Sequence, residues 1–335
     1  MKKILISLCV VAFWVMMAST VQTESAMAET TTLKAITAWP KTDLEYKAFS
    51  LFTDLLDHRV AQKCPGELKI QYIGGPEAVK TPDQVQALQR GMVDMVYTSG
   101  AYYTNVLSEI DSLKLTDYKP AEERGNGALA YLRDLHQKKL GLYYLGRLGL
   151  DIKFHLYLKG KSIKSADLKG LNIRVSPLYL QAIIGLGGNP VVMPLSEIYA
   201  ALERNVVDGY CMPSVGIREY GLQRQTQYIV DPGFYNVPNP LLVNLKTWDH
   251  LPQKLKEVLT EATIEAEKKV VVMMDNLAKE ERPILIKEGL QVIDLPPAEK
   301  NKFLKIAYDE GWKDVIAKNP QTGPELRKLL TKGKS

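Results

Sequence analysis

Histidine and cysteine are the residue types that most often carry metal or nucleophilic chemistry, and this sequence uses few of them. The 335-residue chain has four histidines, no two of them at the spacing of zinc ligands, and three widely separated cysteines. No Gly-x-Ser-x-Gly elbow and no Walker-type phosphate loop occurs. The sequence therefore predicts no catalytic residue, no metal and no cofactor, so an enzyme is possible but unsupported.

The first 28 residues have the three-part organisation of a secretory signal peptide. Lys2 and Lys3 precede an apolar run, and Ala26-Met27-Ala28 offers a small-x-small cleavage site. The alternative is a membrane anchor, but the run is shorter than the ~20 residues that a membrane span needs. We therefore expect an exported, soluble mature protein that begins near residue 29.

The cysteines that remain after cleavage are Cys64 and Cys211. Export makes a disulfide between them chemically possible. Cys211 lies in an apolar, strand-like run, which favours a buried free thiol instead.

Length and composition indicate a globular protein of two domains. The chain is 46% hydrophobic and 24% charged, which excludes disorder, and it is too long for one small core. The formal net charge is +5, with both signs interspersed along the chain. Nucleic-acid binding would need a clustered basic face, so we expect no such partner.

Strand-like and helix-like segments alternate, and this pattern predicts an α/β architecture. Apolar residues at helical spacing predict a helix over 44–60, between strands over 33–38 and 68–73. A long helix is expected over 121–139. The longest begins after Pro252, and Pro283 is expected to kink or end it.

A short internal repeat supports two domains of one style. The segment 88–95, Leu-Gln-Arg-Gly-Met-Val-Asp-Met, resembles 202–209, Leu-Glu-Arg-Asn-Val-Val-Asp-Gly. Each predicts a helix end, a left-handed cap at Gly91 or Asn205, and then a strand, because Gly and Asn tolerate that conformation. Two such domains facing each other would form a cleft, which is a common place for a ligand.

The stretch from Asp167 to Gly209 carries a resemblance to a known family. It contains Asp-Leu-Lys-Gly-Leu-Asn-Ile-Arg-Val at 167–175, Gly-Asn-Pro-Val-Val-Met-Pro-Leu-Ser-Glu-Ile-Tyr-Ala-Ala-Leu at 188–202, and Val-Val-Asp-Gly at 206–209. In this order and spacing the segments resemble the solute-binding proteins of tripartite ATP-independent periplasmic (TRAP) transporters. The resemblance extends to Glu45-Tyr46-Lys47 and to the helix after Pro252.

The resemblance implies a two-domain Venus-flytrap fold with hinge strands and a long helix that spans both domains. We expect residues 29–152 and about 241–280 in domain I, and 153–240 and about 281–335 in domain II. The implied protein is a periplasmic monomer or weak dimer from a Gram-negative bacterium. It would bind a small organic acid, deliver it to a small and a large membrane subunit, and catalyse nothing.

The same resemblance assigns the main ligand contact to Arg174, the arginine of the family's Ile-Arg-Val motif. A guanidinium presents a fork of donors that matches a carboxylate in two parallel hydrogen bonds. The alternative is an ordinary surface arginine, but Arg174 stands at the end of an apolar strand, just before Ser176-Pro177. We therefore expect Arg174 to bind the carboxylate.

Further contacts are carried over from the family by position. His155 lies near the place of a second family arginine, with Lys153 and Arg147 as rivals, and a locally bonded strand histidine is the alternative. Where the family has Gln-Glu-Asn-Pro, this chain has Tyr210-Cys211-Met212-Pro213. The other expected cleft residues are Trp39, Thr98, Ser99, Gly100, Phe234 and Asn236.

The departure at 210–213 predicts the ligand's character. A sugar acid needs many polar partners, whereas Trp39, Tyr210, Met212 and Phe234 would form an apolar wall. We expect a monocarboxylate with an apolar or aromatic body, such as a keto acid or aromatic acid, unless these side chains pack the domain core instead. A sensor that presents the bound acid to a signalling receptor would use the same fold, so the sequence leaves transport and sensing open.

Overall fold

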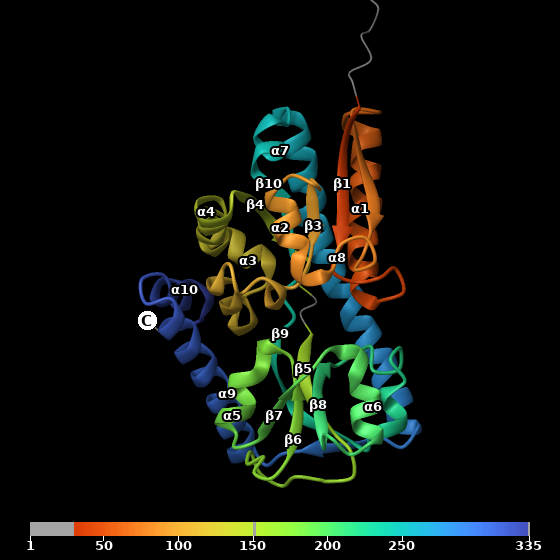
Figure 1. The fold of residues 1–335 in the computed structure, drawn as a ribbon, viewed down its shortest axis with the longest axis vertical. Helices are drawn as coiled ribbons and strands as arrows, with labels where there is room; N and C mark the ends of the chain where they lie inside the picture. The colour runs from red at the N-terminus through yellow and green to blue at the C-terminus, as the bar shows by residue number, and fades with distance from the viewer. Residues whose placement is uncertain (1–29, 150–151, 334–335) are drawn as a thin grey trace, which may run out of the picture.

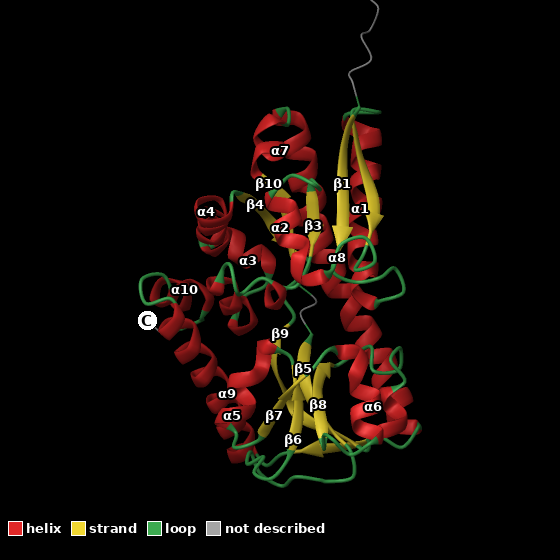
Figure 2. Cartoon of the chain, viewed as in Figure 1, coloured by secondary structure: helices red, strands yellow, loops and turns green. Residues whose placement is uncertain are grey.

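The computed structural model describes residues 30–149 and 152–333, which fold around two separate β-sheets (Figures 1 and 2). The predicted α/β architecture is confirmed. The predicted signal peptide lies outside the described residues. None of the described helices is both long enough and apolar enough to cross a membrane.

The first sheet has five strands in the order β2-β1-β3-β10-β4. These are β1 (Thr31–Thr37), β2 (Leu68–Gly74), β3 (Met95–Tyr97), β4 (Leu142–Arg147) and β10 (Pro240–Asn244). β1 is parallel to β2 and β3, while β10 runs antiparallel to β3 and β4. A late strand is thus inserted among early ones, so the chain must return from the second sheet to complete the first.

The second sheet has six strands in the order β11-β9-β5-β8-β6-β7. These are β5 (Lys153–Leu158), β6 (Asn172–Val175), β7 (Asn189–Val192), β8 (Gly209–Pro213), β9 (Tyr228–Asn236) and β11 (Gln291–Asp294). β6 is parallel to β7 and β8, and β5 is antiparallel to β8 and β9.

Helices cover both sheets, and the longest one belongs to both. They are α1 (Leu44–Lys63), α2 (Gln84–Gln89), α3 (Pro120–Gly125), α4 (Ala128–Leu140), α5 (Leu180–Gly185), α6 (Ile198–Glu203), α7 (Leu245–His250), α8 (Gln253–Lys287), α9 (Pro297–Lys318) and α10 (Gly323–Leu330). α8 packs on β4 of the first sheet, and its Arg282 pairs with Asp231 of β9 in the second sheet. α8 continues past Pro283, so this proline does not end the helix.

The chain passes from the first sheet to the second between β4 and β5, and it returns between β9 and β10 (Figure 1). The two connecting segments touch where the Leu148 N–H donates to the Asn239 carbonyl at 3.0 Å. The last helix, α10, packs on the 3-10 helix η3 (Ser108–Leu115) and on α9 and α4, beside the first sheet. The end of the chain therefore lies on the first-sheet side and not with the second sheet, where we expected it.

The predicted repeat is a real structural unit. Gly91 and Asn205 both adopt positive φ, 71° and 57°, as the left-handed caps that join α2 to β3 and α6 to β8. In each unit the following aspartate binds a neighbouring strand. Asp94 Oδ2 accepts from the Lys34 N–H, and Asp208 Oδ2 accepts from the Asn172 N–H, both at 2.9 Å. The two copies of the helix-to-strand unit therefore share both the left-handed cap and the aspartate hydrogen bond.

The helix expected over 121–139 is in fact two helices, α3 and α4. Gly127 separates them in a left-handed conformation with φ of 92°, which an α-helix cannot contain. The Asn126 side chain then accepts a hydrogen bond from the Ala128 N–H at the start of α4.

Candidate ligand-binding site

A small cavity of about 90 Å³ lies where the ends of β1 and β3 face the ends of β6 and β8. The carboxyl ends of parallel strands meet there from both sheets, which is where α/β folds usually bind ligands. The lining residues are Trp39, Glu45, Ser99, Ala101, Tyr102, Phe154, Arg174, Ser176, Leu178, Tyr179, Leu195, Met212, Pro213, Val237 and Asn239. The volume is well below the roughly 300 Å³ of a typical drug-sized pocket, which suits a small solute.

Arg174 is the cation of this cavity, and it is held rigidly. Its side chain is buried, with 5% of the residue exposed. Nε and Nη2 both donate to the Met193 carbonyl, at 3.1 and 2.8 Å, and Nη1 donates to the Tyr179 hydroxyl at 2.7 Å. That hydroxyl in turn donates to the Cys211 carbonyl. The guanidinium is therefore oriented before any ligand arrives.

These contacts leave part of the guanidinium available. Arginine has five N–H bonds, and three of them are used by Met193 and Tyr179. One N–H remains on each of the two Nη nitrogens. These two donors are available to the oxygens of a carboxylate.

The other charged side chain of the cavity lining is Glu45, from the first turn of α1. Burial raises the pKa of its carboxyl from 4.5 to about 7, and the negative charges of Asp43 and Glu219 add to the rise. The carboxyl is therefore substantially protonated near neutral pH. Most of the remaining wall is apolar or aromatic.

The cavity brings together four of the residues expected from the sequence. Arg174, Trp39, Ser99 and Met212 all line it. Trp39 stacks at an angle near Tyr102, with ring centroids 6.2 Å apart, so two aromatic rings flank one wall. Tyr102 is 40% exposed and marks the side open to solvent.

Five other expected residues lie outside the cavity. Tyr210 stands two residues before Met212 on β8, farther from the cleft. It stacks on Tyr157 in the second core cluster. Phe234 packs edge-on against Phe303. Thr98 and Gly100 are buried on either side of Ser99, and Asn236 donates to the Thr116 carbonyl at the crossing between sheets.

None of the three candidates for a second anion contact reaches Arg174's cavity. His155 Nδ1 lies 3.0 Å from the Val230 carbonyl and 3.1 Å from Asp231 Oδ1. Lys153 Nζ donates to the Asn236 side chain at 2.7 Å. The Arg147 guanidinium is bound to Glu123. The structure therefore agrees with the alternative for His155, a strand histidine that is bonded to neighbouring residues.

His155 and Lys153 line a larger hollow of about 620 Å³, beside α8. Its charges are mixed: Lys279 and Arg282 lie there with Asp275. Arg282 and His155 are both paired with Asp231, and despite burial these partners lower the pKa of that carboxyl to about 2. We place the site in the smaller cavity because its arginine, Arg174, is bound only by neutral groups, whereas Arg282 of the larger hollow is paired with the carboxylate of Asp231.

Tyr179, Asn239 and Glu45 line the cavity but were not identified from the sequence. Asn239 follows Val-Pro in the segment Val-Pro-Asn-Pro between two strands, where a polar residue amid apolar ones is the only signal. Glu45 belongs to the Glu-Tyr-Lys segment already noted in the first helix. Tyr179 follows the Ile-Arg-Val motif by four residues, and its residue type carries no such signal.

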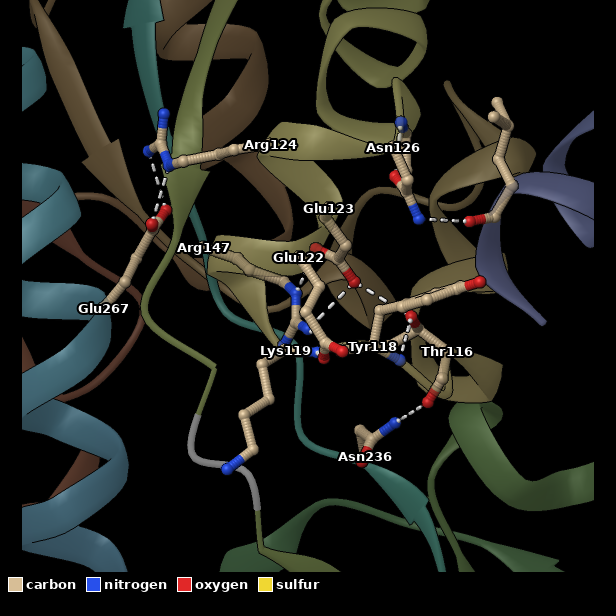
Figure 3. A network of polar contacts seen from close by, with 12 residues as sticks. Thr116, Tyr118, Lys119, Glu122, Glu123, Arg124, Asn126, Arg147, Asn236 and Glu267 are labelled. Atoms are coloured by element: carbon tan, nitrogen blue, oxygen red, sulfur yellow. Dashed lines mark hydrogen bonds and ion pairs between the residues drawn. The ribbon is translucent and has the colours of Figure 1, made fainter. Parts of the chain in front are cut away.

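A buried polar network supports the crossing between the sheets (Figure 3). Arg147 Nε and Nη2 donate to the two oxygens of Glu123 at 2.8 and 2.9 Å, with both side chains at most 3% exposed. Thr116 Oγ1 also donates to Glu123, and its carbonyl accepts from Asn236. The network thus links α3 and β4 to the end of β9.

The structure also describes the two cysteines and the side chains of the metal-ligating types. Cys64 and Cys211 are both buried free thiols, as favoured above. Within residues 30–149 and 152–333, no group of three or more His, Cys, Asp or Glu side chains is arranged to hold a metal ion.

The sequence matches a known family of solute-binding proteins. The family model described as "Bacterial extracellular solute-binding protein, family 7" matches residues 36–319. This chain belongs to that family of TRAP solute-binding proteins. Members of the family bind solutes for transporters and are not enzymes.

Relatives of known name and structure agree with the family assignment. A monocarboxylate 2-oxoacid-binding periplasmic protein of Nostoc sp. (strain PCC 7120) is 27% identical over 287 residues, covering 82% of this chain and 76% of the relative. Two solved TRAP solute-binding proteins share the fold. The Desulfovibrio salexigens protein, with bound orotic acid, has a TM-score of 0.76 at 18% identity, covering 89% of this chain and 97% of its own. The Bordetella bronchiseptica protein, with copurified calcium and picolinate, has a TM-score of 0.73 at 24% identity, covering 90% and 92%.

Proposed function

We propose that this TRAP solute-binding protein captures a small monocarboxylate with an apolar or aromatic body in the cavity of Arg174. The observation that carries the proposal is the pair of unused N–H donors on a buried, fixed guanidinium. The ligand's carboxylate would take both donors, and the rest of the ligand would lie against Trp39, Tyr102 and Met212.

The charges of the cavity favour one carboxylate over two. A dicarboxylate would need a second cation, but the lining contains only Arg174 and, against it, the acid Glu45. A second carboxylate would be desolvated without a partner, which is costly. Relatives are named for related ligands: a 2-oxoacid for the Nostoc protein, and picolinate for the Bordetella protein.

Ligand binding would act through closure of the two halves. Arg174 and Met212 come from the second sheet, while Trp39 and Ser99 follow strands of the first. A ligand that touches both halves stabilises the closed form and shifts the population toward it. We propose that the protein is exported to the periplasm by residues 1–28 and passes its ligand to the two membrane subunits of a TRAP transporter.

A panel of acids tests this proposal. We expect 3-methylbutanoate, phenylacetate and their 2-oxo forms to raise the melting temperature of the purified mature protein by several degrees, because a ligand that binds only the folded state stabilises it. Succinate and glucuronate serve as the dicarboxylate and sugar-acid comparisons. Stabilisation by glucuronate or succinate alone would overturn the proposed ligand class.

The raised pKa of Glu45 gives a pH prediction. A bound anion raises this pKa further above its value of about 7. The complex then holds more protons than the free protein, so affinity falls as the pH rises through this value. Titration calorimetry should show affinity about 3- to 10-fold weaker at about pH 8 than at about pH 6.

The variant Glu45→Gln keeps the size of the side chain and cannot titrate, so it should flatten the pH profile. Glu288→Gln removes an exposed carboxylate that pairs with Arg218 and serves as the matched control. An unchanged pH dependence in Glu45→Gln would assign the effect to another group.

A further inference from the structure

A segment of the second half of the protein reaches across to helix α1 of the first half. Residues 214–222 follow β8, and the Ser214 N–H joins them to the second sheet by donating to the Lys153 carbonyl of β5 at 3.0 Å. α1 lies on the first sheet, where Phe49 stacks on Tyr97 of β3 with ring centroids 5.9 Å apart (Figure 1). A contact between this segment and α1 therefore joins the two halves.

Two polar contacts connect the segment to the start of α1. The Tyr220 hydroxyl donates to Asp43 Oδ2 at 2.9 Å, in a part-buried position. Lys47 Nζ lies 3.2 Å from Glu219 Oε1, and the two side chains are 50% and 35% exposed. The exposed ion pair contributes little because water screens its charges, whereas a hydroxyl that donates to a carboxylate makes a stronger, charge-assisted bond. The bond between Tyr220 and Asp43 is therefore the main polar contact of the two.

The hydroxyl of Tyr220 is held near α1 and stays protonated. Glu281 of α8 fixes the backbone of the segment by accepting a hydrogen bond from the Gly216 N–H at 2.7 Å. Burial raises the pKa of Tyr220, and the negative charges of Glu45 and Asp43 add to the rise. The hydroxyl therefore remains a hydrogen-bond donor.

Asp43 occupies the N-cap position of α1 but does not cap this helix. An aspartate in this position usually accepts a hydrogen bond from an N–H of the first turn, and its φ of −81° and ψ of 152° suit that role. Here the side chain makes no cap hydrogen bond, and Oδ2 accepts from Tyr220 instead. Departures from such local preferences are expected at functional sites. The carboxylate thus has two alternative partners, one in its own helix and one in the other half.

We propose that the hydrogen bond between Tyr220 and Asp43 is a latch, which forms when the two halves close over the ligand and then holds them closed. This inference rests on the proposed function, because the cavity of Arg174 lies between the same two halves. When the halves open, Tyr220 moves away and Asp43 is released to cap α1. Neither latch residue belongs to the cavity lining, so the latch stabilises the closed complex by the same amount with any ligand.

The variant Tyr220→Phe removes the hydroxyl and keeps the ring, so it tests the latch directly. Titration calorimetry should show about 3- to 10-fold weaker binding, by the same factor for every acid that the wild-type protein binds. Stopped-flow fluorescence, to which Trp39 of the cavity contributes, should assign this loss to faster release with an almost unchanged association rate. The reason is that the closed complex must open before the ligand can leave.

The variant Asp43→Ser removes the latch from the other side. Serine is as good an N-cap residue as aspartate, but it is shorter, so α1 keeps a cap and Tyr220 loses its acceptor. At about pH 6, where the Glu45 carboxyl is mostly protonated, this variant should show the same loss of affinity as Tyr220→Phe. The double variant should show no further loss, because both substitutions remove one and the same bond.

Tyr199→Phe is the matched control. Tyr199 of α6 is a partly buried tyrosine that packs against the same core cluster as Tyr220. The control should bind and release every acid as the wild-type protein does.

The possible failures of the latch and of the proposed function can be told apart. Affinities and release rates of Tyr220→Phe equal to those of Tyr199→Phe would overturn the latch and leave the proposed function intact. A loss that differs from acid to acid, or losses that add in the double variant, would also overturn it, because the two side chains would then act separately or touch the ligand. Failure of every acid to bind the wild-type protein would overturn the proposed function and this inference with it.

Discussion

Replacing Arg174 by alanine will weaken binding of monocarboxylates by at least about 30-fold, because truncating one member of a buried, hydrogen-bonded charge pair typically costs about 2–5 kcal/mol. The ligand's carboxylate would lose both guanidinium donors in a cavity whose lining contains no other cation. Titration calorimetry with the tightest-binding acid of the panel measures the loss.

The folded protein should survive this change. Arg174 makes its hydrogen bonds to the Met193 carbonyl and the Tyr179 hydroxyl, and Tyr179 retains its bond to Cys211. Arg218→Ala, which removes an exposed arginine paired with Glu288, is the matched control and should leave affinity unchanged. Circular dichroism checks that both variants are folded. An affinity for the acid equal to that of the control would disprove the role of Arg174.

Replacing Arg147 by methionine will destabilise the protein by about 3–5 kcal/mol, because it leaves the carboxylate of Glu123 buried without its cation. Both side chains are at most 3% exposed, and their two hydrogen bonds form the centre of the network in Figure 3. Urea denaturation followed by circular dichroism measures the free energy of unfolding.

The double variant Arg147→Met with Glu123→Met should recover most of this loss, because an apolar pair of similar volume replaces both charges. Lys138→Met is the surface control. It breaks an i,i+4 pair with Asp134 whose side chains are 73% and 45% exposed, and it should cost less than about 1 kcal/mol. Equal losses in Arg147→Met and Lys138→Met would contradict the assignment of a buried, coupled pair.

The sequence predicted the elements that depend on residue type and on the spacing of nearby apolar residues. The left-handed caps at Gly91 and Asn205 were predicted from residue type, because few other residues tolerate positive φ. The helix that begins near residue 44 followed from apolar spacing. The break at Gly127 was missed because a glycine within a helical pattern is often tolerated, and only the observed φ identifies it as a boundary.

Position along strand β8 explains why one predicted site residue, Met212, lines the cavity and another, Tyr210, does not. Tyr210 and Met212 share one face of β8, so alternation could not separate them. Both belong to one core cluster, but Met212 lies at the end of the strand and also lines the cavity, whereas Tyr210, about 7 Å farther along, does not. Whether a strand residue lines a cleft depends on where the sheet ends, which its own sequence does not specify.

The sequence by itself determined the α/β elements, the repeated helix-to-strand unit and the family motif that contains Arg174. These features depend on residue type and on neighbours a few positions away. Only the tertiary structure decided which donors of Arg174 are free, because Met193 and Tyr179 occupy the others. It also decided that Arg147 pairs with Glu123 and that Asn239 lines the cavity. Pairing and burial are set by segments that the fold brings together from distant parts of the chain.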